Sequence, residues 1–183
     1  MTISTSPGQD VLTPFGNFAF HVVFEAVSGT FDPGAGVGEA LFGGFSEISG
    51  LEATMEHKVI KAGGRNYGAV LRAGPVSFGT VVMKRGIVSS AHLWRWWSMF
   101  AGSDGAADGR PLQANRSNVL IGLMSTVGSD PTKSEPKARL GWKLRNAMPV
   151  KFRVGDLNAK GTDVAIEELH LVHEGLEMKG VVA

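Results

Sequence analysis

The chain has 183 residues, the usual size of one domain, and a domain of this length buries roughly 70% of the surface that its unfolded chain would expose. Its 18 Lys plus Arg and 17 Asp plus Glu give a formal net charge of +1, so no global field favours binding to nucleic acid or to an anionic membrane. The absence of cysteine excludes a disulfide framework, thiol catalysis and cysteine-based zinc sites.

The first residues, MTISTSPGQDVLTPFG, have neither a basic start nor an apolar core of signal-peptide length, and no apolar run approaches ~18 residues. We therefore expect the protein to be synthesised and folded in the cytoplasm and not to span a membrane by itself. We expect residues 1–183 to form a single domain, with residues 1–14 as a flexible N-terminal arm.

Alternation of apolar and polar residues with a period of two predicts strands along most of the chain. The second strand has irregular apolar spacing, which indicates a bulge, and in the last strand the apolar phase slips between Glu167 and Glu168, which predicts another. Clusters of Gly, Pro, Ser and Asp predict loops at Ser28–Gly44, Ala101–Pro111 and Ser125–Lys137. The predicted strands are Asn17–Val27, Glu47–Lys61, Val76–Val88, Asn118–Met124, Trp142–Val154 and Val164–Glu177.

One helix is predicted over Ala91–Phe100, with Ser89 or Ser90 as the N-cap and Gly102 beyond its end. Its apolar residues recur at i, i+3, i+4 and i+7 and form a single stripe of Leu93, Trp96, Trp97 and Phe100. One helix among six or seven strands predicts a mainly β fold. We expect an antiparallel β-sandwich or barrel-like double sheet with one flanking α-helix.

No group of residues predicts catalysis, a metal site or a cofactor site. His170 and His173 lie three apart, and on a strand such residues point to opposite faces. The glycines at 34, 36 and 38 lack the dinucleotide-binding spacing, and GFSEI (44–48) lacks the second glycine of a nucleophile elbow. Asp104 and Asp108 lack the remaining ligands of a calcium loop. We expect no enzyme activity.

Two further groups keep two interpretations each. The tryptophans Trp94, Trp96 and Trp97 beside Arg95 could stack on nucleic-acid bases, but core packing is favoured, and Trp94, off the stripe, could reach a neighbouring subunit. The strand that begins at Trp142 carries one apolar face and one row of cations, which is either a solvated sheet face or the lining of a channel or partner surface. These cations are Lys143, Arg145, Lys151 and Arg153.

The C-terminal region resembles the tail tube proteins of contractile phages and extracellular contractile injection systems. Two earlier blocks, Gly43–Gly64 and Val76–Phe100, fit the same family in the same order. The matching C-terminal residues are Trp142, Leu144, Asn146, Ala147, Pro149, Val150, Lys151, Asp156–Ala159, Gly161, Val164–Glu167, Leu169, Leu171 and His173–Leu176.

The resemblance implies a β-sandwich of which six copies close into a ring, with the inner sheets joined into one barrel and the rings stacked into a hollow tube. Such a tube is a passive conduit that a contracting sheath drives through a target envelope. The implied partners are other copies of the chain, a sheath protein, baseplate and tube-cap proteins, and a lumenal cargo of protein effector or DNA. The implied location is a virion tail or a phage-tail-like injection particle.

The resemblance also implies roles for particular residues. The segment 61–74 would reach the next ring, with Lys61, Arg65, Tyr67 and Arg72 as contacts, and the four cations of the row would face the lumen or the sheath. We expect subunit contacts from Trp94, Glu167, Glu168, Leu169, Leu171 and His173.

Two other functions remain open from the sequence. Long loops at Ser28–Phe42 and Ser125–Lys137 are compatible with a specialised tube-initiating or baseplate-hub ring of the same apparatus. The cation row and the tryptophans are compatible with a single-stranded nucleic-acid-binding module.

Overall fold

The computed structural model describes residues 20–26, 44–61, 63–88, 91–102, 115–124, 138–158 and 164–180. The predicted N-terminal arm (1–14) lies outside these ranges, as do residues 28–43, 103–111 and 125–137 of the three predicted loops. Within the described ranges, no helix is long and apolar enough to cross a bilayer.

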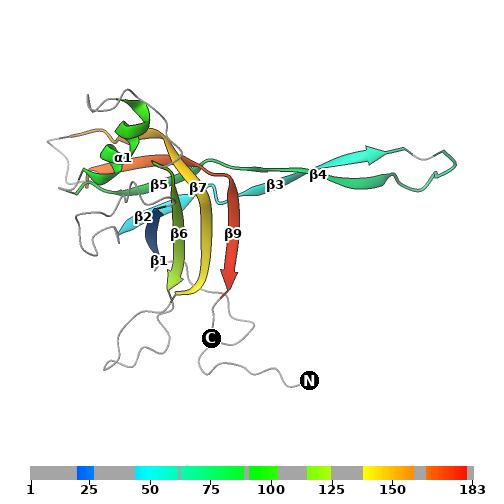
Figure 1. Ribbon diagram of the computed structural model, residues 1–183, viewed down its shortest axis with the longest axis horizontal. Coiled ribbons are helices and arrows are strands. Elements are labelled where there is room, and N and C mark those ends of the chain that lie inside the picture. The colour runs from blue at the N-terminus through cyan, green and yellow to red at the C-terminus, as the bar shows by residue number, and fades with distance from the viewer. Residues whose placement is uncertain are drawn as a thin grey trace, which may run out of the picture.

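The described residues form one helix and nine strands, shown in Figure 1. Seven strands make one sheet in the order β1-β6-β7-β8-β5-β2 with β9 also paired to β7, and β3 pairs only with β4. Every strand pair is antiparallel, which confirms the predicted fold class. The elements are β1 (Phe20–Ala26), β2 (Phe45–Ser49), β3 (Ala53–Ile60), β4 (Val70–Phe78), β5 (Val81–Gly86), α1 (His92–Ala101), β6 (Ser117–Met124), β7 (Ala138–Val154), β8 (Ile166–Val172) and β9 (Gly175–Gly180).

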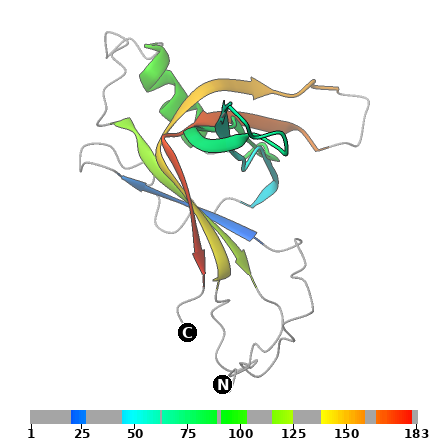
Figure 2. The same ribbon diagram turned by 90° about the vertical axis from the view of Figure 1, so that its right-hand side faces the viewer.

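The long strand β7 folds the sheet into two layers, and Figure 2 shows it curving from one to the other. Its first half pairs with β6 and β9, and its second half pairs with β8. Asn146 lies at the bend with a φ of 51°, a left-handed conformation that asparagine tolerates better than most residues, and a register shift follows between Pro149 and Lys151. The first layer is therefore β1, β6, the first half of β7 and β9, and the second layer is the rest of β7 with β8, β5 and β2.

The core lies between the two layers and beneath α1. Each fully buried side chain of the size of Leu or Phe contributes roughly 1.5–3 kcal/mol relative to an exposed one. The indole Nε1 of Trp96 donates a hydrogen bond of 2.8 Å to the carbonyl oxygen of Asn115, which satisfies the polar atom of this buried ring. The core side chains are Val22, Phe24, Phe45, Val81, Met83, Leu93, Trp96, Val119, Ile121, Leu144, Ala147, Leu169 and Leu171.

The predicted strand Glu47–Lys61 is wrong as a single element, because the chain turns at Gly50 and passes from β2 into the separate hairpin strand β3. Gly50 has a φ of 81°, and a Cβ there would lie 2.1 Å from the carbonyl oxygen of Thr80. The irregular spacing did indicate bulges, since β2 shifts register after Phe45 and β3 shifts after Met55. At position 50 only glycine fits, because it adopts the positive φ and leaves room for the carbonyl group of Thr80.

The predicted strand Val76–Val88 is also divided. Its first residues complete β4, and β5 begins at Val81 after the short break at Gly79 and Thr80. The amide of Gly79 donates a hydrogen bond of 3.1 Å to the carbonyl oxygen of Glu52 and so ties together the two chain segments at the base of the hairpin.

The predicted strand Val164–Glu177 divides into β8 and β9 at His173 and Glu174, and the predicted bulge at Glu167 and Glu168 is wrong. The pairing of β8 with β5 continues from Ile166 to Leu171 without a register shift. The apparent phase slip arises because an inward position of β8 is occupied by Glu167, a buried charged residue.

The structure confirms the predicted apolar stripe of α1 and the predicted end of the helix before Gly102. Gly102 has the left-handed C-cap conformation, and its amide donates a hydrogen bond of 2.7 Å to the carbonyl oxygen of Ser98. The N-cap position is Ala91, without a side-chain hydrogen bond, so the expected serine cap is corrected. Ser89 and Ser90 themselves lie outside the described residues.

Candidate assembly surfaces

The hairpin of β3 and β4, called here the arm (residues 53–78), projects from the body of the molecule (Figure 1). All residues of β3 are exposed, and the arm's strands pair only with each other. Large apolar side chains lie on it without cover, including Tyr67, which is 97% exposed, and Leu71, which is 63% exposed. An isolated two-stranded hairpin is marginally stable in water, and these side chains therefore indicate a contact surface.

The distal part of the arm, residues 58–72, carries four cations and no acidic residue. Lys58 and Arg72 lie directly opposite each other on the two strands, a like-charge pair that destabilises the hairpin by itself. The structure places the four predicted inter-ring residues on this exposed surface: Lys61, Arg65, Tyr67 and Arg72. The segment that the resemblance implied would reach the next ring forms the tip and second strand of a hairpin, and this strand begins at Val70.

The first layer has a free edge at each side. In the order β1-β6-β7-β9, β1 pairs only with β6 and β9 pairs only with β7 among the described strands. Unpaired backbone groups along such edges bind another strand readily.

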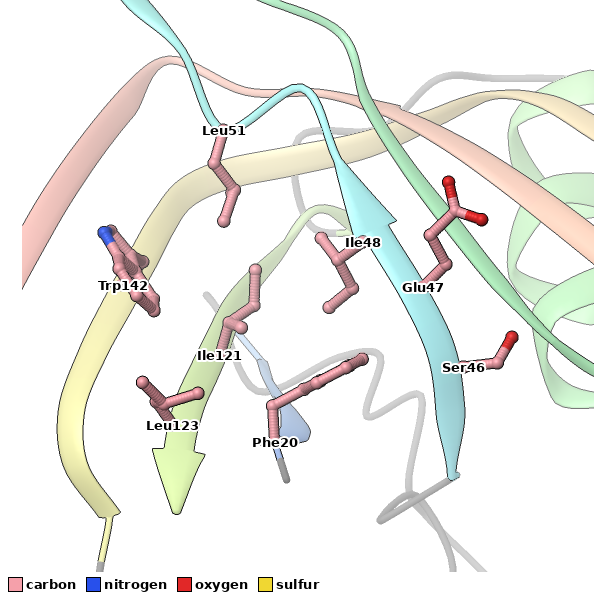
Figure 3. A pocket seen from close by; sticks show the side chains of 8 residues that line it. All are labelled: Phe20, Ser46, Glu47, Ile48, Leu51, Ile121, Leu123 and Trp142. Atoms are coloured by element: carbon pink, nitrogen blue, oxygen red, sulfur yellow. The ribbon is translucent and has the colours of Figure 1, made fainter. Parts of the chain in front are cut away.

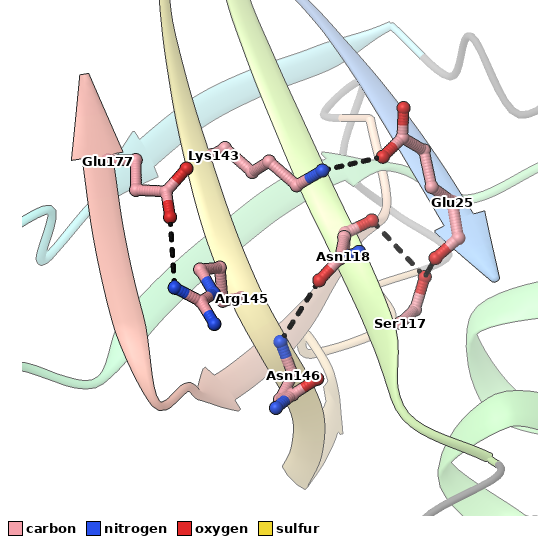
Figure 4. A network of polar contacts seen from close by, with 7 residues as sticks. All are labelled: Glu25, Ser117, Asn118, Lys143, Arg145, Asn146 and Glu177. Atoms are coloured by element: carbon pink, nitrogen blue, oxygen red, sulfur yellow. Dashed lines mark hydrogen bonds and ion pairs between the residues drawn. The ribbon is translucent and has the colours of Figure 1, made fainter. Parts of the chain in front are cut away.

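The outer face of the first layer, opposite Leu144, carries charges that are paired across strands (Figure 4). Lys143 Nζ donates to Glu25 Oε2 at 3.1 Å, and Arg145 Nη1 donates to Glu177 Oε1 at 3.2 Å. Such exposed pairs contribute about 0–1 kcal/mol each. Their main consequence is that two of the four predicted cations are electrically compensated.

The other two cations, Lys151 and Arg153, lie on the second half of β7, beside β8. Arg153 Nη1 is 3.6 Å from Glu168 Oε2. Because β7 bends at Asn146, the four cations belong to two layers and do not form the single row that the alternation indicated.

Trp94 lies at the surface, as the sequence predicted, and is 42% exposed. Its ring centroid is 5.0 Å from that of Trp97 and 5.4 Å from that of Phe152. Trp96 is buried in the core, which confirms core packing for that tryptophan. Trp94 on α1 and Phe152 on β7 form an edge-to-face aromatic contact, which we call the Trp94 surface.

Among the predicted subunit contacts on β8, Leu169 and Leu171 are fully buried, because both point into the core between the two layers. The expectation that these two leucines touch a neighbouring subunit is therefore corrected to a place in the core. Glu168 is partly exposed on the opposite face, and His170 Nε2 is 3.7 Å from its Oε2. The described residues contain no group of three His, Asp or Glu side chains that could hold a metal.

Glu167 forms a buried ion pair that the sequence reasoning missed. Arg85 Nε donates to Glu167 Oε1 at 2.5 Å, and the Arg85 guanidinium lies 5.7 Å from the ring centroid of Phe45. Arg85 Nη2 is buried without a hydrogen-bond partner among the described residues. The available signal was the alternation Val81, Met83, Arg85, which places Arg85 inward.

The turn between β8 and β9 touches the base of the arm through His173, whose ring centroid is 5.0 Å from that of Phe78. Burial lowers the pKa of His173, and the backbone of Gly175 partly opposes the shift. Next to it, hydrogen bonds from the side chains of Asn146 and then Arg116 lower the pKa of Glu174. The corner thus combines a partly buried histidine with a carboxylate that accepts hydrogen bonds from two side chains.

An apolar pocket of about 270 Å³ opens between β2 and the first layer (Figure 3). We call it the interlayer pocket. Of the described residues that line it, only Glu47 is charged, and its Oε2 accepts a hydrogen bond of 3.0 Å from Lys84 Nζ. The pocket is lined by Phe20, Ser46, Glu47, Ile48, Leu51, Ile121, Leu123 and Trp142.

Three solved structures with the same fold come from the anti-feeding prophage and from an extracellular contractile injection system. A chain of the sixfold-symmetrised baseplate of the anti-feeding prophage has 26% sequence identity and a TM-score of 0.64, with 93% of this chain and 99% of that chain covered. A chain of the extended PVC sheath-tube complex, an extracellular contractile injection system, has 17% identity and a TM-score of 0.67, with 93% and 95% covered. A chain of the anti-feeding prophage tube-terminating cap has 15% identity and a TM-score of 0.64, with 99% and 100% covered.

Among individually curated proteins, none matches the chain. The family described as T4-like virus tail tube protein gp19 matches residues 16–177, which include all six predicted strands in full. The resemblance read from the sequence is confirmed, as is the expectation of a structural protein without enzyme activity. The chain belongs to the T4-like tail tube protein family.

Proposed function

We propose that this chain is the repeated inner tube subunit of a contractile tail or injection system, with six copies in a ring and rings stacked into a hollow conduit. The observation that carries the proposal is the first layer, which has a free edge on each side and a charged outer face. The sixfold symmetry of the similar baseplate structure supports the number of copies.

In this assembly, β9 of one copy pairs with β1 of the next. Ring closure then leaves no free edge in the first layer, which removes the tendency of those edges to aggregate. Each backbone hydrogen bond contributes about 1 kcal/mol net, and a specific interface normally buries more than ~1,000 Å² in total. The outer face of the first layer lines the lumen, with Lys143 and Arg145 held beside Glu25 and Glu177.

The arm forms the contact between rings, in addition to the edge pairing within each ring. Its exposed position and its uncovered apolar side chains make it the described element best suited to reach a subunit of the next ring. Lys61, Arg65, Tyr67 and Arg72 are the proposed contacts. The proposed contacts with a sheath protein or with neighbouring subunits lie away from the first layer. They are Lys151, Arg153 and the Trp94 surface.

A specialised ring is the second candidate function. The observation that favours it is that the 26% identical structure comes from a baseplate, and another similar structure is a tube-terminating cap. In either role the partners are the tube, sheath, baseplate and cap proteins of one particle. The cargo in the lumen is a protein effector or DNA.

Electron microscopy of the purified chain tests the proposal. Stacked tubes support the repeated subunit, single sixfold rings that never stack support the specialised ring, and a protein that stays monomeric at high concentration contradicts both.

The edge pairing has its own test, made clean by the absence of native cysteine. Copies with Val23→Cys in β1 are mixed with copies that carry cysteine at Gly175, Glu177 or Lys179 in β9, and the mixture is oxidised. We expect disulfide-linked dimers at one β9 position, because a disulfide needs Cβ atoms about 3.5–4.5 Å apart. Leu120→Cys, one strand in from the edge, is the matched control and should give none.

A further inference from the structure

The arm and the interlayer pocket are two apolar surfaces that the described residues of one copy leave uncovered. The arm carries uncovered apolar residues, and it projects away from the body while the pocket opens beside β2 within it (Figure 1, Figure 3). The base of the arm is held in this direction by Gly50 and by the hydrogen bond from Gly79 to Glu52. A second copy must therefore supply any arm that enters the pocket.

We propose that the interlayer pocket is the receptor for the distal arm of a second copy, with the ring of Tyr67 seated among its apolar side chains. The proposal rests on the stacked rings of the proposed function and names the partner surface of the arm. A head-to-tail contact between different surfaces of one molecule does not close on itself, so it propagates from ring to ring.

The size and lining of the pocket fit this occupant. A cavity of roughly 150 Å³ lined by apolar side chains admits a benzene ring, so the 270 Å³ of the interlayer pocket has room for the phenol ring of Tyr67 and for part of a neighbouring side chain. Ile48, Leu51 and Trp142 supply apolar contacts to the ring, and the phenol hydroxyl remains at the open mouth of the pocket, where water can bind it.

The pocket also offers a hydrogen-bond acceptor to the cations of the distal arm. The distal arm has only cations, and Lys58 and Arg72 repel each other across its two strands. Among the described lining residues only Glu47 is charged, and Lys84 donates to its Oε2. A carboxylate accepts hydrogen bonds at both oxygens, so an arm cation beside Glu47 Oε1 relieves the repulsion within the hairpin.

Cysteine cross-linking tests this pairing. Copies with Ser46→Cys are mixed with copies with Tyr67→Cys, assembled and oxidised, so that a bond between the two positions joins two chains. We expect a dimer band at least ten times stronger than in the matched control mixture, which pairs Tyr67→Cys with Asp156→Cys, an exposed residue beyond the end of β7.

Three outcomes are informative. Tubes that assemble without a 46–67 bond above the control overturn the proposed receptor and leave the tube function intact, whereas failure to assemble overturns both. A cysteine at position 46 that is already shielded from maleimide in dissociated subunits overturns the receptor as well, because another part of the same chain then fills the pocket.

A second variant keeps the test independent of cysteine chemistry. Tyr67→Ser changes a fully solvent-facing side chain, so the fold and the ring should be retained. We expect the fraction of stacked rings to fall at least tenfold by electron microscopy. Unchanged stacking by this variant contradicts the seating of Tyr67.

Discussion

The body and the arm of this protein both consist of antiparallel strands, but they differ in the burial of apolar side chains and in the pairing of charges. In the body, inward residues such as Leu144 are fully buried between two layers, and outward charges are paired across strands. In the arm, Leu71 is exposed and Lys58 faces Arg72. The difference indicates that the body is stabilised by its own core, whereas the arm would acquire its stabilising contacts in the proposed assembly.

The largest effect is expected from the buried ion pair of the body. Glu167→Ala leaves Arg85 charged and unpaired in the core, and we expect a loss of about 3–5 kcal/mol in the free energy of unfolding, measured by urea denaturation. Glu168→Ala, the neighbouring and less buried residue, should cost less than about 1 kcal/mol. Equal losses in the two variants would contradict the special position of Glu167.

The comparison of body and arm is sharpest for two leucines. Leu144→Ala should lower the free energy of unfolding by about 2–5 kcal/mol, because it opens a cavity in the core. Leu71→Ala should change it by less than about 0.5 kcal/mol and instead reduce stacking of rings, since its side chain is exposed. A large loss of monomer stability in Leu71→Ala would show that the arm packs on the body.

Two glycines with nearly equal φ angles separate backbone strain from steric conflict. Gly50→Ala at the arm's base combines a φ of 81° with a Cβ 2.1 Å from Thr80 O, and the cost should exceed the roughly 1–2 kcal/mol expected for left-handed strain alone. Gly64→Ala near the tip has a φ of 79° with open space around it, and only the strain should be measured. Thermal unfolding of both variants gives the comparison.

A smaller effect is expected from pH at the corner between body and arm. Because burial lowers the pKa of His173, the unfolded chain binds a proton more readily than the folded one. The stability from this residue is present above about pH 6.5, the usual value for histidine, and falls as the pH decreases below it. His173→Phe, which keeps a ring against Phe78, should reduce this part of the pH dependence in urea titrations.

The smallest effect on stability concerns the outer face of the first layer. Lys143→Ala removes the exposed pair with Glu25 and should cost less than about 1 kcal/mol in urea denaturation. If the face lines the lumen, a thiol-reactive label at Lys143→Cys should be protected from large reagents in assembled tubes and accessible in dissociated rings. Equal labelling in the two states contradicts the lumenal position.

The sequence by itself determined the secondary-structure class, the helix and the family. Period-two patterns placed strand residues along β1, β6 and β7, and the apolar stripe placed Leu93 and Trp96 toward the core, because these signals depend only on which residues avoid water. It also placed the exposed contact candidates of the arm, Lys61 to Arg72, in one segment.

Only the tertiary structure decided where the continuous patterns break and which residues face each other. The chain turns at Gly50, between β2 and β3, and the close approach of Thr80, thirty residues away, leaves no space there for a side chain. Glu167 interrupts the apolar alternation of β8 because it forms a buried ion pair with Arg85. The four cations of β7 belong to two layers because this strand bends at Asn146. These features depend on contacts between distant segments, and local alternation carries no information about such contacts.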